Sequence, residues 1–117
     1  MFKSAILTVM VSDMNRALEF YAGTLGFERG ERYGDEWAEV RAGGFRIGLH
    51  PGGKAPIKEH ARHYTIGLQV DDLDVAKKAL EAKGVKFTQA PPDRGLRLAY
   101  FTDPDGNPLY LAEIKWG

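Results

Sequence analysis

The stretch Phe101-Thr102-Asp103-Pro104-Asp105-Gly106-Asn107-Pro108-Leu109-Tyr110-Leu111 predicts a β-hairpin near the end of the chain. Two runs rich in β-forming residues, 96–102 and 108–114, flank a tight connection. In this connection proline fixes φ, aspartate can bond nearby backbone amides and glycine permits a positive φ. The second arm closes a predicted sheet and carries Tyr110, a position that decides between functional hypotheses.

The first half of the chain predicts one helix and four strands. The expected strands are 5–11, 27–32, 37–42 and 45–50. Between the first two strands, apolar residues at helical spacing predict a helix that Ser12 or Asp13 caps and that Gly26 ends.

The second half repeats this order. The expected elements are a strand at 63–70, a helix from Leu73 to Gly84, a strand at 85–89, a Pro-rich loop at 90–95 and the hairpin. Asp71 or Asp72 is the expected helix cap. Residues 51–62 lack usable periodicity and are predicted to be a linker or a flap.

The two halves indicate an internal duplication. Val11-Ser12-Asp13-Met14 aligns with Val70-Asp71-Asp72-Leu73, and the Gly43-Gly44 turn aligns with Asp105-Gly106. We therefore expect an α+β fold of two βαβββ modules that form a curved, cup-like mixed sheet with helices outside. The whole chain, 1–117, is expected to be one domain, with module 1 at about 1–50, a linker at about 51–62 and module 2 at about 63–117.

Composition excludes several kinds of partner and chemistry. The 117 residues include 16 Lys and Arg and 16 Asp and Glu, so net charge favours neither nucleic acid nor an anionic membrane as partner. The absence of cysteine excludes disulfides and thiolate chemistry. No export signal or membrane-spanning run is visible, so we expect a cytoplasmic protein.

These motifs resemble the vicinal oxygen chelate superfamily, which includes glyoxalase I, bleomycin-resistance proteins, fosfomycin-resistance enzymes and extradiol dioxygenases. The resemblance rests on Val11-Ser12-Asp13-Met14, Phe20-Tyr21, Leu25-Gly26-Phe27, Val70-Asp71-Asp72-Leu73 and Asp103-Pro104-Asp105-Gly106-Asn107-Pro108, and it covers essentially the whole chain. It implies the two-module fold and a homodimer. It does not fix the function, because the superfamily contains several enzyme classes as well as plain binders.

Metal-dependent members of this superfamily hold their ion with His and Glu side chains on the cup face of four strands. Local alignment places those positions at Ile6, Gly48, Thr65 and Tyr110, none of which is a usual metal ligand. We therefore expect no metal and no other cofactor, and glyoxalase and dioxygenase mechanisms lose their support.

Strand alternation predicts which side chains line the cup instead. The expected lining residues are Thr8, Met10, Trp37, Glu39, Arg41, Arg46, His50, Thr65, Gly67, Gln69, Arg97, Phe101, Tyr110, Ala112 and Ile114. Aromatic and aliphatic patches with a few polar groups are typical of a small-molecule pocket, and several arginines suit an anionic substituent. From this wall we predict that the ligand-binding residues are Met10, Trp37, Glu39, Arg41, Arg46, His50, Gln69, Arg97, Phe101 and Tyr110. The aromatic residues could instead fill the core, and the arginines could pair with Glu39 or with surface carboxylates.

Titratable side chains offer a few further candidates. His50 ends a cup strand and is the candidate catalytic base, although an exposed strand-end histidine is the plainer interpretation. A non-standard metal site of His50, His60 and His63 has only sequence spacing behind it. Asp103 and Asp105 are interpreted as turn carboxylates that bond local backbone amides rather than as a catalytic pair.

Three functional hypotheses follow. The first is a metal-independent small-molecule binding protein of the bleomycin-resistance type, which sequesters an aromatic or anionic compound in the cup. The second is an enzyme of the same superfamily, a lyase, isomerase, hydrolase-like or dioxygenase-like protein, that uses His50 as base with Tyr110 or Glu39 as its partner. The third is a module whose cup serves a protein partner.

Overall fold

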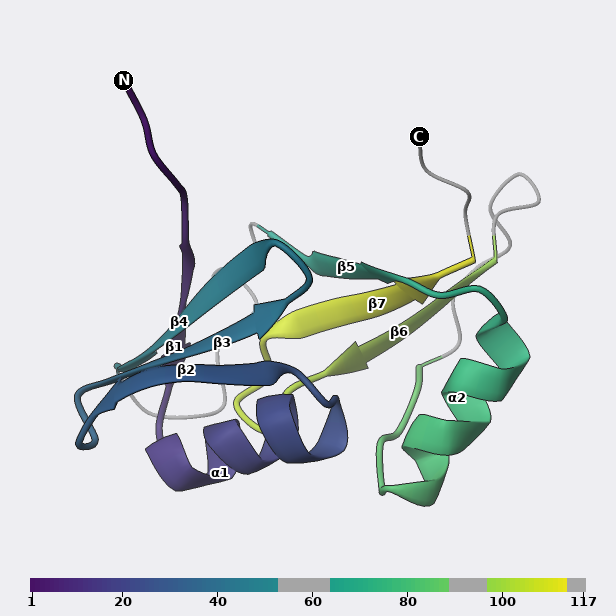
Figure 1. Ribbon diagram of the computed structural model, residues 1–117. Helices are drawn as coiled ribbons and strands as arrows, with labels where there is room; N and C mark the ends of the chain where they lie inside the picture. The colour runs from purple at the N-terminus through teal and green to yellow at the C-terminus, as the bar shows by residue number, and fades with distance from the viewer. Residues whose placement is uncertain (53–63, 89–96, 114–117) are drawn as a thin grey trace. The chain divides into compact units, whose positions relative to one another are not determined.

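The computed structural model describes residues 1–52, 64–88 and 97–113 (Figure 1). Its elements are β1 (Leu7–Val11), α1 (Met14–Leu18), the π-helix η1 (Glu19–Thr24), β2 (Glu28–Tyr33), β3 (Trp37–Ala42), β4 (Phe45–Pro51), β5 (Ile66–Gln69), α2 (Leu73–Ala82), β6 (Leu98–Thr102) and β7 (Pro108–Ala112). The chain divides into two compact units, residues 1–57 with 104–106, and residues 58–103 with 107–117. Each unit contains one sheet, and the units are described separately below.

The first unit contains a four-stranded mixed sheet in the order β1-β4-β3-β2. β1 runs parallel to β4, and the other neighbours are antiparallel. Alternate side chains of β1, β4 and β3 are almost fully buried, namely Val9, Val11, Ala38, Val40, Ile47 and Leu49. They lie on the face that α1 covers, which leaves the opposite face to the remaining side chains.

The helix of the first unit begins as the capping signal predicts. Asp13 is the N-cap, and its side chain accepts a hydrogen bond from the Arg16 amide. After Leu18 the α-helix continues as the π-helix η1, which the sequence did not predict. The turn ends at Gly26, whose φ of 78° suits glycine.

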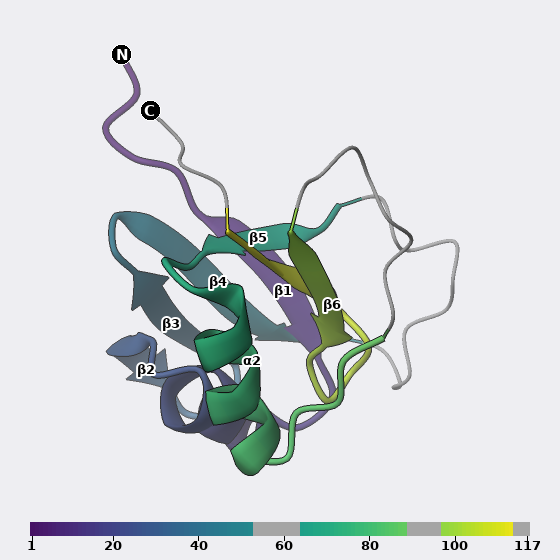
Figure 2. The same cartoon turned by 90° about the vertical axis from the view of Figure 1, so that its right-hand side faces the viewer.

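The second unit contains a three-stranded sheet in the order β5-β7-β6, with β5 parallel to β7 and β6 antiparallel to it. Asp72 caps α2 through the Val75 amide, and the chain reverses after the helix at Gly84, whose φ is 94°. Figure 2 shows α2 alongside β6, which it contacts together with β7. The parallel pairing of the first strand with the last repeats the topology of the first unit, so the predicted α+β class is confirmed.

Two sequence expectations need correction or fall outside the described residues. The predicted strand at 85–89 is wrong for residues 85–88, the part that the structure describes, where Thr88 forms an isolated bridge with Tyr100 and no strand is present. Most of the predicted linker and the whole of the predicted Pro-rich loop lie outside the described residues, as do His60, His63 and Ile114. The predicted hairpin is confirmed as β6 and β7, closed by a hydrogen bond from the Asp103 amide to the Asn107 carbonyl.

No helix among residues 1–52, 64–88 and 97–113 combines the length and the apolar character that crossing a membrane requires.

Candidate functional site

The face of the first sheet that α1 does not cover gathers most of the predicted site residues. We call this surface the open face, and it carries Thr8, Met10, Trp37, Glu39, Arg41, Arg46, Gly48 and His50. Strand pairing sets Arg41 opposite Arg46, Glu39 opposite Gly48, and Met10 opposite His50. Residues paired in this way project to the same side of a sheet, so these side chains are neighbours.

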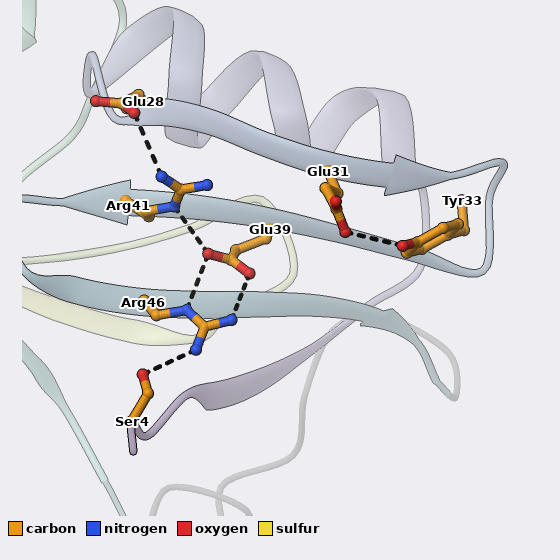
Figure 3. Close-up of polar contacts among 7 residues, drawn as sticks. All are labelled: Ser4, Glu28, Glu31, Tyr33, Glu39, Arg41 and Arg46. Carbon is orange, nitrogen blue, oxygen red and sulfur yellow. Dashed lines mark hydrogen bonds and ion pairs between the residues drawn. The ribbon is translucent and has the colours of Figure 1, made fainter.

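An ion cluster lies across two strands of the open face (Figure 3). The Glu39 carboxylate accepts hydrogen bonds from Arg46 Nε at 3.0 Å, Arg46 Nη2 at 2.8 Å and Arg41 Nε at 2.8 Å. Arg46 also donates to Ser4 Oγ at 2.8 Å, and Arg41 lies 3.5 Å from Glu28 at the sheet edge. The two guanidinium groups therefore hold the Glu39 carboxylate between them, and the contact from Arg46 is bidentate.

The cluster is asymmetric in exposure. The Glu39 side chain is only 11% exposed, whereas Arg41 and Arg46 are 40% and 36% exposed. Hydrogen bonds from Arg46 and then Arg41 lower the pKa of Glu39 to about 2, although burial opposes this change. The same contact with Glu39 raises the pKa of Arg46. Glu39 is therefore ionised at neutral pH and does not serve as a general acid there.

We expect Glu39 to make stability depend on pH in a defined range. Its pKa falls from an ordinary value of 4.5 to about 2 in the folded protein, so its ionised contacts stabilise the fold above about pH 4.5 and are lost as pH falls toward 2. Thermal unfolding of Glu39→Gln should show the largest loss against the parent above pH 4.5, with the difference shrinking below it. Glu28→Gln, whose carboxylate is 75% exposed, is the matched control. A difference that stays constant down to pH 2 would contradict this assignment.

The six-membered ring of the Trp37 indole lies over Gly48. A Cβ atom built on Gly48 would overlap the six-membered ring of Trp37, so this contact depends on the missing side chain. Gly48 is directly opposite Glu39, which brings the indole beside the ion cluster. An aromatic surface and a charged group therefore share the middle of the open face.

Met10 and His50 form the outer end of the open face. Met10 is 42% exposed, and His50 is also exposed. His50 Nδ1 lies 2.7 Å from the Pro51 carbonyl oxygen, which can only accept a hydrogen bond. Nδ1 therefore donates, and the lone pair of the neutral ring is on Nε2.

The second unit repeats the contact between an aromatic ring and a glycine. The Tyr110 ring lies across Gly67, its strand partner, and also packs against Tyr100 at 5.7 Å between ring centroids. Gln69 is exposed at the end of β5, two residues beyond Gly67 and on the same side. Tyr110 and Gln69 thus lie on the sheet face that we predicted for them.

Two residues lie on the other face of that sheet from the one predicted. Phe101 is 2% exposed, pairs with Leu109 and packs against Phe87 at 5.3 Å, so it belongs to the core under α2. Arg97 pairs with Asp74 of α2 at 3.0 Å and with Glu113 at 3.4 Å, and the contact with Asp74 raises the pKa of Arg97. The cup-face assignment of both residues is wrong by one position in the strand alternation.

The two turn carboxylates do different things. Asp103 bonds locally, as predicted, because it accepts from the Asn107 amide and from Asn107 Nδ2, both at 2.8 Å. Asp105 bonds a segment far away in the sequence. It is 1% exposed and accepts from Ser12 N at 3.1 Å, Ser12 Oγ at 2.6 Å and Arg16 Nη2 at 3.3 Å. The turn therefore anchors the start of the helix in the first unit.

A separate hollow of about 260 Å³ lies at the start of α1. It is lined by Ser12, Asp13, Met14, Asn15, Asp35 and Pro51. None of the predicted ligand-binding residues lines it. Arg32 spans Asn15 and Asp35 with hydrogen bonds of 2.8 and 2.9 Å, which accounts for these polar groups structurally.

The residues at the positions where the vicinal oxygen chelate superfamily holds its metal do not suit a metal ion. Ile6 and Gly48 offer no donor, and the ring of Trp37 fills the space that a side chain at Gly48 would need. Thr65 and Tyr110 offer only hydroxyl groups, which bind zinc and manganese poorly compared with imidazole or carboxylate. Within the described ranges, no cluster of three or more His, Asp or Glu side chains is arranged to hold an ion.

Comparison with known families identifies the class of protein that this fold defines. The sequence model of the Glyoxalase/Bleomycin resistance protein/Dioxygenase superfamily matches residues 4–111. The chain belongs to this superfamily, and the resemblance seen in its motifs is thereby confirmed. A comparison with curated proteins found no match.

Solved structures share the fold over nearly the whole chain. A member of the glyoxalase/bleomycin resistance protein/dioxygenase superfamily from Sphaerobacter thermophilus is 30% identical, with a TM-score of 0.70 over 96% of this chain and 97% of that one. TnmS3, an antibiotic binding protein from Streptomyces sp. CB03234, is 26% identical, with a TM-score of 0.72 over 96% and 95%. A mutant of the fosfomycin resistance protein FosX from Listeria monocytogenes, complexed with Mn(II) and a dihydroxypropylphosphonic acid, is 24% identical, with a TM-score of 0.79 over 97% and 90%. This last likeness concerns the fold alone.

Proposed function

We propose that this protein is a metal-independent small-molecule binding protein that sequesters an aromatic or anionic compound against the open face of the first sheet. The observation that carries the proposal is the Trp37 indole, laid over Gly48 beside the cluster of Arg41, Glu39 and Arg46. A rigid aromatic surface next to partly exposed guanidinium groups is a common way to hold a flat or acidic ligand.

Metal independence is part of this proposal and rests on the donor set. The superfamily's metal positions provide neither imidazole nor carboxylate here, and Trp37 covers one of them. Sequestration requires a preorganised surface rather than a catalytic group. TnmS3 supports the proposal because its name describes an antibiotic binding protein on the same fold.

The test is ligand-induced thermal stabilisation in the presence of EDTA. Among 2-naphthoate, 2-naphthol and phenylphosphonate, at least one should raise the melting temperature in a concentration-dependent way, because binding to the folded state stabilises it. Trp37→Ala should fold yet lose that rise. Phe45→Ala, an aromatic residue 43% exposed and on the other face of the same sheet, is the matched control and should keep it. No rise with any compound, or a rise that survives Trp37→Ala, would overturn the proposal.

An enzyme that uses His50 as base is the second candidate. The observation that favours it is the 2.7 Å contact between His50 Nδ1 and the Pro51 carbonyl, which leaves Nε2 free to accept a proton. On this hypothesis His50→Ala abolishes turnover of a bound compound but leaves its binding intact. If the protein only binds, the parent protein already leaves every compound chemically unchanged, and mass spectrometry of the ligand incubated with the parent and with the variant distinguishes the two.

We also propose a homodimer, on the strength of the family resemblance. The edge strands of the first sheet differ in a way consistent with an interface, since β2 carries Glu28, Arg29, Glu31 and Arg32 whereas β1 reads Leu-Thr-Val-Met-Val. Charged edge strands resist pairing with a second chain, and uncharged ones allow it. Light scattering at tens of micromolar should give twice the monomer mass of 13.0 kDa, and a monomer would contradict this proposal.

A further inference from the structure

The open face is organised in rows across its strands. Pairing sets Arg46 beside Arg41 and Arg41 beside Glu28, which forms a charged row at one end. At the other end Met10 pairs with His50, and Trp37 pairs with Tyr33. The register that joins Ala38 to Leu49 sets Trp37 opposite His50, one residue further on, so this second row is aromatic and apolar.

Side chains from both rows extend over the row between them, which contains Glu39 and Gly48. The indole of Trp37 reaches back over Gly48, while Arg41 and Arg46 reach in to Glu39, the strand partner of Gly48. Glu39 and Gly48 are directly paired, and paired Cα atoms lie about 4.5 to 5.5 Å apart, so the indole over Gly48 and the guanidinium groups bonded to Glu39 occupy neighbouring positions on the open face.

Partly exposed guanidinium groups border this middle row. Arg41 and Arg46 are 40% and 36% exposed and enclose the Glu39 carboxylate, which is 11% exposed. A further carboxylate of this face, Glu31, accepts a hydrogen bond from the Tyr33 hydroxyl (Figure 3). Glu28 touches Arg41 only at 3.5 Å and is 75% exposed at the sheet edge, where water screens it. Each guanidinium has five N–H donors, and Glu39, Ser4 and Glu28 engage only some of them.

From this arrangement we infer that the ligand is an aryl monoanion, a planar aromatic ring with a carboxylate, phosphonate or sulfonate attached directly to it. The ring stacks on the Trp37 indole, and the anionic group receives hydrogen bonds from Arg41 and Arg46. This inference rests on the proposed binding function and narrows the class of ligand. A ring without an anionic group would contact only Trp37, and an anion without a ring would contact only the arginines. Because Gly48 and Glu39 are direct strand partners, we expect the anionic group to be on the ring itself rather than on a long spacer.

Calorimetric titration of the full chain with matched probes tests the inference. We expect 2-naphthoate to bind at least about tenfold more tightly than naphthalene-2-carboxamide, which keeps the ring but lacks the charge, because hydrogen bonds to charged groups are the stronger ones. Cyclohexanecarboxylate, which keeps the charge but lacks the aromatic ring, should also bind more weakly than 2-naphthoate. Added salt should weaken 2-naphthoate binding and leave the carboxamide unchanged.

Arginine variants test whether the open face causes the preference for the acid over the amide. Arg46→Gln and, separately, Arg41→Gln should abolish the preference for the acid over the amide, with folding checked by circular dichroism. The matched control is Arg97→Gln, which removes an arginine that is 46% exposed and ion-paired in the second unit, and this variant should keep the preference. Two different variants keep the test valid if one of them fails to fold.

The results of these titrations distinguish failure of the aryl monoanion inference from failure of the proposed binding function. Equal affinity for acid and amide, both lost in Trp37→Ala, would overturn the aryl monoanion and leave the binding function standing. No binding of any probe would overturn both. A change of oligomeric state in Arg46→Gln, without any change in probe selectivity, would show that a second copy of the chain occupies the open face and would overturn the inference.

Discussion

Gly48→Ala is expected to destabilise the protein by about 1 to 3 kcal/mol, the usual cost of forcing an extra group into a packed site. The new methyl group would overlap the ring of Trp37, and Gly48 is itself buried in the central strand β4. The indole must therefore leave its place, which should also abolish binding of 2-naphthoate. Chemical denaturation and calorimetric titration measure the two effects.

Gly44→Ala is the matched control, because a methyl group there meets nothing within 4 Å. A double-mutant cycle identifies the cause of the loss. In a Trp37→Ala background the clash is gone, so Gly48→Ala should cost much less than it does alone. An equal cost in both backgrounds would show that the overlap with Trp37 is not the reason why glycine is needed.

Asp105→Ala is expected to cost about 2 to 3 kcal/mol, because it removes charge-assisted hydrogen bonds and leaves their donors without this acceptor. The carboxylate is 1% exposed and accepts three hydrogen bonds, two from Ser12 and one from Arg16. Its loss should loosen the start of α1, which faster amide exchange at residues 12–16 would report. Equilibrium denaturation gives the overall cost.

Asp35→Ala is the control for removing an aspartate that pairs with arginine. Asp35 bonds Arg32 at 2.9 Å, but its side chain is 81% exposed, so its removal should cost less than about 1 kcal/mol. If Asp105→Ala proved as mild as Asp35→Ala, the buried carboxylate would not be the anchor that its contacts indicate.

Local signals in the sequence predicted the fold well. Asp13 and Asp72 cap the two helices, and glycines at 26 and 84 follow them, because these positions depend only on nearby backbone geometry. The repeated motif predicted a repeated topology, and the structure has parallel pairing of first and last strands in both sheets.

Contacts between distant segments were beyond the sequence. Asp105 and Ser12 are separated by 93 positions, and an aspartate in a turn normally bonds its own loop. No pattern indicated that this one reaches the start of the helix.

The assignment of faces in β6 was wrong for a simple reason. Side chains alternate with a period of two, so one step of register exchanges the faces. Pairing of Tyr100 with Tyr110 puts Tyr100 on the side of the Tyr110 ring and sends Phe101 into the core. The sequence of β6, with apolar residues on both sides, does not distinguish the two registers.

The most direct test of the account is an NMR titration of ¹⁵N-labelled, EDTA-treated protein with 2-naphthoate. We predict saturable amide shifts concentrated in β1, β3 and β4 around Trp37 and Gly48, with no metal added. Shifts that appear elsewhere in the chain, or only after a divalent metal ion is supplied, would contradict a metal-independent binding site on the open face.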